Sequence, residues 1–172
     1  MRADDDPVLV ARARRGSSDA LGELFDRHAP AAWRAAYAVC GRRALADEIV
    51  QDAFERVLGK LTQYDDRRAF GPWLHRIVMN RALDVLRREG RYASGVTTAQ
   101  CAPPDEDVSE FLGLVGVLDP ERRVAVVMRY GLGYAPAQIA EILGTPVGTV
   151  HSRLARALED LRTQTEATLY GR

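Results

Sequence analysis

Hydrophobic residues recur every three or four positions along most of this chain, the spacing that places them on one face of an α-helix. The clearest stripe runs through residues 46–61, and others cover 21–39 and 70–86. Shorter stripes follow Asp-Pro pairs at Asp6 and Asp119, where the acidic residue caps a helix and proline occupies its first turn. No segment alternates apolar and polar residues as a β-strand does. The pattern therefore predicts an all-α protein.

The helical periodicity is lost between Gly90 and Ser109, a segment that contains two consecutive prolines and an acidic run. This composition is typical of a linker. We therefore expect two small helical domains, residues 1–90 and residues 109–172, joined by a flexible linker over residues 91–108.

Residues 138–161 contain two helical stripes separated by a tight turn, the arrangement of a helix-turn-helix. Ala140 is small where the two helices would cross, and Gly144 can adopt a left-handed conformation in the turn. The inward-facing residues of the second helix are expected to be Val147, Val150, Leu154 and Leu158. Donors for phosphates and base edges then lie on its outward face, namely Thr149, His151, Ser152, Arg153 and Arg156. A helical hairpin that packs only within its own domain is the alternative interpretation of this motif alone.

Composition and charge narrow the possible functions. The 172 residues, 28% of them charged, suit one or two small globular domains. The 24 basic and 24 acidic side chains balance, so any polyanion site must be a local patch. Cys40 and Cys101 lack the spacing of a zinc site or a disulfide framework. No apolar run is long enough to span a membrane and the start is acidic, so we expect a cytoplasmic protein without membrane insertion.

Four segments carry a more specific resemblance. ADEIVQDAF (46–54), FGPWLHRIVMN (70–80) and DVLRR (84–88) resemble region 2 of bacterial sigma factors, and PVGTVHSR (146–153) resembles the recognition helix of their region 4. The short chain is similar to the extracytoplasmic function (ECF) subfamily. The resemblance implies a region 2 helical bundle in the first domain and a region 4 helix-turn-helix in the second.

The resemblance also implies three sets of functional residues. The face that would dock on core RNA polymerase carries Asp47, Glu48, Gln51, Asp52 and Glu55. The loop 62–68 and the helix after it would read and melt the minus-ten promoter element, with the candidate residues Tyr64, Arg67, Arg68, Arg76, Asn80, Arg81, Arg87 and Arg88. The minus-thirty-five element would contact Thr149, His151, Ser152, Arg153 and Arg156.

Individual residue types sharpen these roles. Asn80 offers both a donor and an acceptor to a base edge, and the arginines can hold the DNA backbone. Tyr64 is the accessible candidate for stacking on an unpaired base, whereas Trp73 is expected in the core. Three positions depart from the usual family pattern. His151 stands where many relatives have a basic residue, Ala155 where many have a bulky one, and Ala135 where a capping Ser or Thr is usual.

The expected protein is thus a sigma factor and not an enzyme, because its sequence has no G-x-S-x-G elbow, P-loop or complete dinucleotide fingerprint. The family implies three partners: the β and β′ subunits of core polymerase, promoter DNA and an anti-sigma factor. No cofactor or metal is expected. The alternative function is a helix-turn-helix repressor or activator that dimerises on a palindrome and binds DNA without polymerase.

Overall fold

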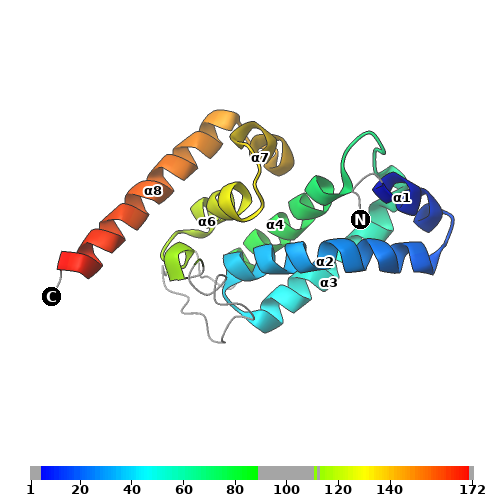
Figure 1. Cartoon of the computed structure of the whole chain (residues 1–172), viewed down its shortest axis with the longest axis horizontal. Helices are drawn as coiled ribbons and strands as arrows, with labels where there is room; N and C mark the ends of the chain where they lie inside the picture. The colour runs from blue at the N-terminus through cyan, green and yellow to red at the C-terminus, as the bar shows by residue number, and fades with distance from the viewer. Residues whose placement is uncertain (1–4, 89–110, 112, 171–172) are drawn as a thin grey trace.

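The computed structural model of the chain describes residues 5–88, 111 and 113–170. Every regular element within these residues is helical, which confirms the all-α prediction. The elements are α1 (Asp6–Arg14), α2 (Ser18–Cys40), α3 (Arg43–Lys60), the 3₁₀ turn η2 (Leu61–Gln63), α4 (Phe70–Arg88), α6 (Pro120–Val126), the π-helical turn η4 (Val127–Gly131), α7 (Pro136–Leu143) and α8 (Val147–Tyr170) (Figure 1). The linker predicted over 91–108 lies outside the described residues.

Helices α1 to α4 form the first bundle. The Ser17 hydroxyl starts α2 by accepting a hydrogen bond from the Ala20 N–H at 3.3 Å, and Gly41 ends the helix with a φ of 69°. The stripes predicted from the sequence face inward except at Phe25 and Leu58, so that α2, α3 and α4 pack against one another and α1 packs against α2. This packing leaves parts of the outer faces of α2, α3 and α4 available as surfaces.

Helices α6, α7 and α8 form the second bundle. The Asp119 carboxylate caps α6 by accepting hydrogen bonds from the N–H groups of Glu121 and Arg122, each at 3.0 Å. Ala135 has no side-chain acceptor for the start of α7, but its own N–H donates to Gln138 Oε1 at 2.8 Å. Gly144 then takes the predicted left-handed conformation, with a φ of 66°, and turns the chain into α8.

The inward face of α8 is shorter than the sequence predicts. Val150 and Leu154 are buried as expected, but Val147 and Leu158 are about half exposed. The reason is that α6 and α7 pack against the middle of α8, where Ala157 completes the buried row. The C-terminal turns of α8 project beyond this packing (Figure 1).

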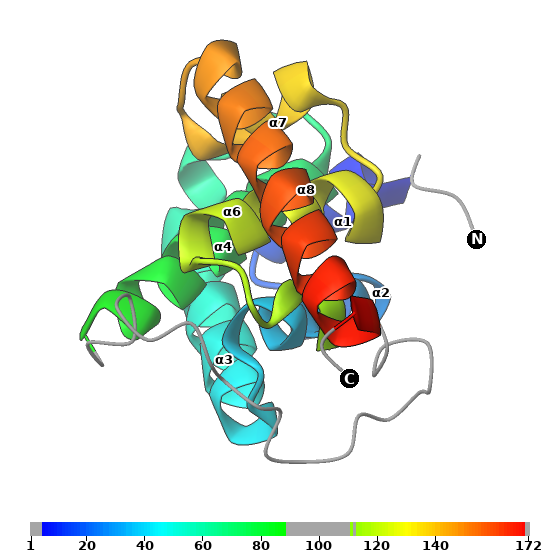
Figure 2. The same cartoon turned by 90° about the vertical axis from the view of Figure 1, so that its left-hand side faces the viewer.

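The two bundles pack against each other through α4 and α2. Helices α6 and α7 lie on α4, while α6 and η4 reach α2. Helix α8 crosses α6 on the side away from the first bundle, which faces the viewer in Figure 2. The buried guanidinium of Arg123 joins the halves, since it donates to the carbonyl oxygens of Val39 at 2.7 Å, Gly116 at 2.7 Å and Leu118 at 2.8 Å. Burial lowers the pKa of Arg123 below its usual value.

Removing this guanidinium should be costly. We expect Arg123→Ala to lower the free energy of unfolding by about 3 kcal/mol or more, because three carbonyl oxygens lose their donor and a cavity remains. Thermal or urea unfolding measures the change. The exposed Arg162→Ala should stay within about 0.5 kcal/mol of the wild type. Equal stability of the two variants would contradict the role given to Arg123.

Candidate functional site

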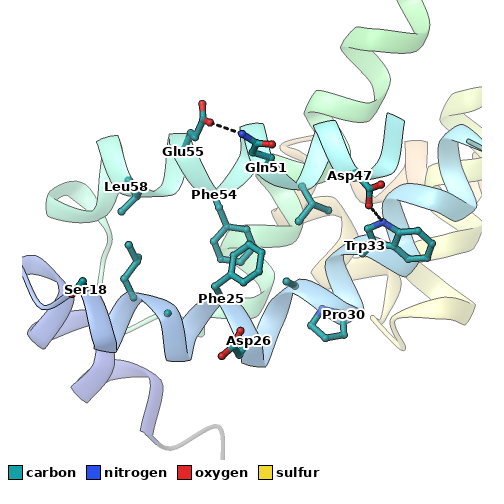
Figure 3. A pocket seen from close by; sticks show the side chains of 14 residues that line it. Ser18, Phe25, Asp26, Pro30, Trp33, Asp47, Gln51, Phe54, Glu55 and Leu58 are labelled. Carbon is teal, nitrogen blue, oxygen red and sulfur yellow. Dashed lines mark hydrogen bonds between the residues drawn. The ribbon is translucent and has the colours of Figure 1, made fainter. Parts of the chain in front are cut away.

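An apolar groove of about 850 Å³ runs between α2 and α3. Figure 3 shows Phe25 of α2 and Phe54 of α3 meeting in its centre, with ring centroids 4.6 Å apart. Phe25 remains 43% exposed and Leu58 50% exposed, which is unusual for large apolar side chains. The groove is therefore an apolar surface that no described part of the chain covers.

Polar side chains line the edge of this groove. Asp47 accepts a hydrogen bond from the Trp33 indole N–H at 2.6 Å, and the Gln51 amide donates to Glu55 at 3.2 Å (Figure 3). Asp26 adds another carboxylate from α2. An apolar centre with a mostly acidic edge suits an amphipathic helix that carries basic residues beside its apolar face.

The five residues predicted to dock polymerase do not all face this groove. Residues 47, 51 and 55 are spaced by four and share its edge, whereas Glu48 and Asp52 lie on the side of α3 that faces α4. There both carboxylates bind Arg81, with its Nε 2.6 Å from Asp52 and its Nη2 3.2 Å from Glu48. The prediction that Arg81 holds DNA is at odds with this pairing, which leaves its side chain only 12% exposed.

Tyr64 was expected to be accessible, and that expectation is wrong. Its side chain is 5% exposed, packs against Phe70 and Trp73, and donates its hydroxyl hydrogen to the Arg68 carbonyl. Burial, with the nearby Asp66 and Asp6 charges, raises the pKa of Tyr64 to about 12. The aromatic ring folds inward because the loop after η2 must cover the start of α4. Trp73, expected in the core, is only partly buried.

A basic pocket of about 380 Å³ lies between α3 and α4. It brings the exposed Arg76 and Asn80, both predicted, together with Arg56 and Lys60 of α3. Trp73 and Ile77 provide its apolar wall. Arg56 and Lys60 were not among the predicted residues, because they share α3 with the acidic residues assigned to polymerase docking. Their spacing of four on one helix face was the available signal.

Helix α8 exposes part of the residue set predicted for the minus-thirty-five element. His151, Ser152 and Arg156 are exposed on α8, and Thr149 is partly buried. The Ser152 hydroxyl donates to the Thr149 carbonyl at 2.9 Å within the helix. Arg153 turns instead toward α6, where its guanidinium binds Glu121.

Several arginines assigned to DNA contact the opposite bundle. Arg68 lies 3.3 Å from Glu141 of α7, and Arg87 lies 3.2 Å from Glu121 of α6. The guanidinium of Arg76 lies beside the end of α7, since a Cβ on Gly144 would be 3.7 Å from its Nη2. Arg67 and Arg88 are exposed. Carboxylates and a helix C-terminus thus neighbour three of the arginines that the resemblance assigns to DNA.

His75 also joins the two bundles. Its Nδ1 shares a hydrogen bond of 2.7 Å with the Tyr134 hydroxyl, while its Nε2 is buried with no hydrogen-bond partner in the described part of the chain. Burial, with a smaller effect of the His28 charge, lowers the pKa of His75 to about 4. His75 is therefore neutral near pH 7.

Within residues 5–88, 111 and 113–170, no helix is both long and apolar enough to cross a membrane. The same residues contain no group of three or more His, Cys, Asp or Glu side chains placed to hold a metal ion.

Cys40 is buried, and burial raises its pKa to about 11. Cys101 lies outside the described residues.

Residues 24–92 match the sequence model of sigma-70 region 2, and residues 109–161 match that of sigma-70 region 4. RNA polymerase sigma factor CarQ of Myxococcus xanthus is 34% identical over 89% of this chain and 93% of its own length. ECF RNA polymerase sigma factor SigW of Bacillus subtilis is 28% identical over 90% and 94%. The structure of CnrH, an RNA polymerase sigma factor of Cupriavidus metallidurans, in complex with the cytosolic domain of CnrY has a TM-score of 0.73 at 29% identity, covering 94% of this chain and 97% of that one.

The buried His75 makes stability depend on pH. The unfolded chain binds the proton with a pKa near 6.5 and the folded chain with a pKa of about 4. The stability that the fold owes to a neutral His75 is therefore fully present above pH 6.5. It is lost as the pH falls toward 4, because the unfolded chain takes up the proton first. Between pH 7 and pH 5 we expect a loss of about 2 kcal/mol from this group.

Urea unfolding at several pH values measures this dependence. His75→Phe should remove that part of the pH dependence, while the exposed His151→Gln should retain it. An unchanged slope in His75→Phe would show that His75 is not the group responsible.

Proposed function

Because this chain belongs to the extracytoplasmic function (ECF) sigma factors of bacterial RNA polymerase, we propose that the apolar groove between α2 and α3 binds core polymerase while two other surfaces read promoter DNA. This groove is called the docking groove below. As an ECF sigma factor, the chain directs transcription initiation by binding core polymerase and by recognising and melting promoter DNA. The observation that carries the assignment of surfaces is the position of α3, which borders the apolar groove on one side and the basic pocket on the other. The match of residues 24–92 to sigma-70 region 2 argues against a conventional repressor or activator, which does not need such a domain.

The docking groove fits a helix of core polymerase. Phe25, Phe54 and Leu58 offer apolar contact area, and the acidic edge adds attraction for basic side chains. Of the five docking candidates, Asp47, Gln51 and Glu55 keep this role. Glu48 and Asp52 stabilise the α3–α4 pair through Arg81 instead. The β and β′ subunits are the proposed source of the docking helix.

The pocket between α3 and α4 is the proposed site for the minus-ten element. Its cationic groups suit the backbone of the displaced strand, and the Asn80 amide suits a base edge. The partly buried Trp73 supplies an aromatic surface at its wall, the role that the buried Tyr64 cannot fill. The exposed loop residues, including Arg67, directly precede the start of α4 at Phe70 and complete the proposed reader.

The outer face of α8 is the proposed reader of the minus-thirty-five element. His151, Ser152 and Arg156 face outward, and Arg153 joins them once it leaves Glu121. Phosphates compete with Glu121 and Glu141 for the arginines of both bundles, so promoter binding favours their separation.

Further partners and location follow from the family. We propose that the chain works in the cytoplasm and that catalysis belongs to the polymerase. An anti-sigma factor is the proposed regulator, since the uncovered apolar groove needs a partner when core polymerase is absent. The solved complex of CnrH with the cytosolic domain of CnrY supports a protein partner for a chain of this fold.

Reversing one charge at the groove edge tests polymerase docking. Glu55→Arg should weaken association with purified core polymerase by about tenfold, because it places like charges across the contact. Glu166→Arg makes the same change on the exposed end of α8 and should leave the affinity unchanged. Titration of labelled protein with core polymerase measures both, and equal affinities would remove the groove from the docking site.

Two alanine substitutions separate the DNA readers. Asn80→Ala should reduce promoter melting, followed by permanganate reactivity of unpaired thymines, without changing binding to the upstream element. Arg156→Ala should weaken binding to the upstream element by about tenfold. Run-off transcription and mobility shifts with reconstituted polymerase measure the two effects. Identical defects in both variants would reject the division into two readers.

A further inference from the structure

The N-terminal helix α1 lies outside the segment that matches region 2, yet its last turn contacts the loop after α3. Arg14 Nε donates to the Leu61 carbonyl at 2.8 Å, and a second guanidinium nitrogen donates to the Tyr64 carbonyl. Its third nitrogen lies 2.9 Å from an Asp66 carboxylate oxygen. One side chain thus binds the loop at three points.

These contacts lie where the backbone leaves regular structure. Leu61 begins η2, and Tyr64 follows its last residue, so their carbonyls lie at the boundary between a 3₁₀ turn and the loop. The guanidinium also lies 5.9 Å from the centre of the Tyr64 ring. Beyond Tyr64, the residues 65–69 are exposed. The Arg14 contacts therefore fix the point from which the exposed part of the loop extends.

The opposite end of α1 is itself anchored. Asp6 is buried and accepts hydrogen bonds from Arg27 at 2.7 Å and His28 at 2.8 Å, both on α2. The His28 ring packs on Phe70, the first residue of α4, at a centroid distance of 4.9 Å. With Leu9 and Val10 buried between these ends, α1 forms a brace between α2 and the loop.

We propose that Arg14 is a positioning residue for minus-ten recognition. It holds the backbone of residues 61–66 so that Arg67 and Arg68 keep one arrangement toward the DNA. Arg14 acts through the loop and does not contact a base. The proposal rests on the proposed function in one respect, that the loop 62–68 reads the minus-ten element.

Arginine is needed for this role because its planar guanidinium donates in several fixed directions. Lysine could reach one carbonyl oxygen with its ammonium group but could not bind two carbonyls and a carboxylate in the same geometry. Arg14→Lys therefore keeps the charge and most of the side-chain volume while losing the geometry. Arg12→Ala is the matched control, since Arg12 is an exposed arginine on the same helix.

The test uses full-length variants reconstituted with core polymerase on promoters whose minus-ten element is randomised. Transcripts are sequenced to give the base preference at each position. Arg14→Ala should reduce the preference at loop-read positions at least fivefold, Arg14→Lys should recover less than half of it, and Arg12→Ala should match the wild type. Preference at the minus-thirty-five element should not change in any variant.

Hydrogen exchange gives a second measurement that does not depend on transcription. The amides of Tyr64 and Arg68, bonded to the carbonyls of Leu61 at 3.4 Å and Asp65 at 3.0 Å, should exchange at least tenfold faster in Arg14→Ala. Amides in the middle of α2 should exchange as in the wild type. Equal exchange at Tyr64 and Arg68 in both proteins would overturn the positioning role.

A loop variant, Arg67→Ala, separates this inference from the proposed function. If Arg67→Ala changes the minus-ten preference and Arg14→Ala does not, the positioning role is wrong and the loop remains the reader. If neither variant changes the preference, the loop is not the reader and both proposals fall. Lower overall transcription in Arg14→Ala with an unchanged preference would show a purely structural contact and would also overturn the inference.

Discussion

The buried guanidinium of Arg123 is the contact on which the arrangement of the two bundles depends. It lies on α6 but donates to the carbonyl of Val39 at the end of α2, as well as to carbonyls just before α6. A buried cation needs acceptors, and the terminal nitrogens of Arg123 find one of theirs at the end of α2, so α6 is held against the first bundle. Glu121, two residues earlier, is thereby brought within reach of Arg87 on α4 and Arg153 on α8.

This arrangement gives the arginines two competing sets of partners. Within the chain they bind carboxylates of α6 and α7, and in the proposed complex they bind phosphates and bases. Both sets are charge-assisted, but separating the bundles also breaks the Arg123 and His75 contacts between them, so the binding energy from polymerase and DNA must offset both costs. The docking groove is on the α2–α3 side of the first bundle and does not depend on this exchange. In the proposed function, polymerase engages the first bundle through this groove.

The helices were predictable from the sequence because hydrophobic spacing, the Asp119 cap and terminal glycines all act locally. The predicted cap at Asp6 is wrong, because Asp6 lies inside α1 and bonds Arg27 and His28 of α2 instead. The candidate sites were less predictable from the sequence than the helices, because each site depends on which face of one helix packs against another. The acidic row of α3 divides between a groove and an internal ion pair once α4 is placed beside it. Tyr64 turns inward and Arg153 turns to α6 for the same reason, and Arg14 gains its role from residues about fifty positions away. Periodicity along one helix carries no information about such partners.

The central claim is that two DNA-reading surfaces on one chain direct core polymerase to its start sites. The most direct measurement is start-site-resolved transcription of fragmented genomic DNA by purified core polymerase, with and without this chain. The account predicts new start sites that share two upstream elements at a fixed spacing and that appear only when the chain is present. Sequence-specific DNA binding by the chain alone, with no new start site when core polymerase is added, would contradict it.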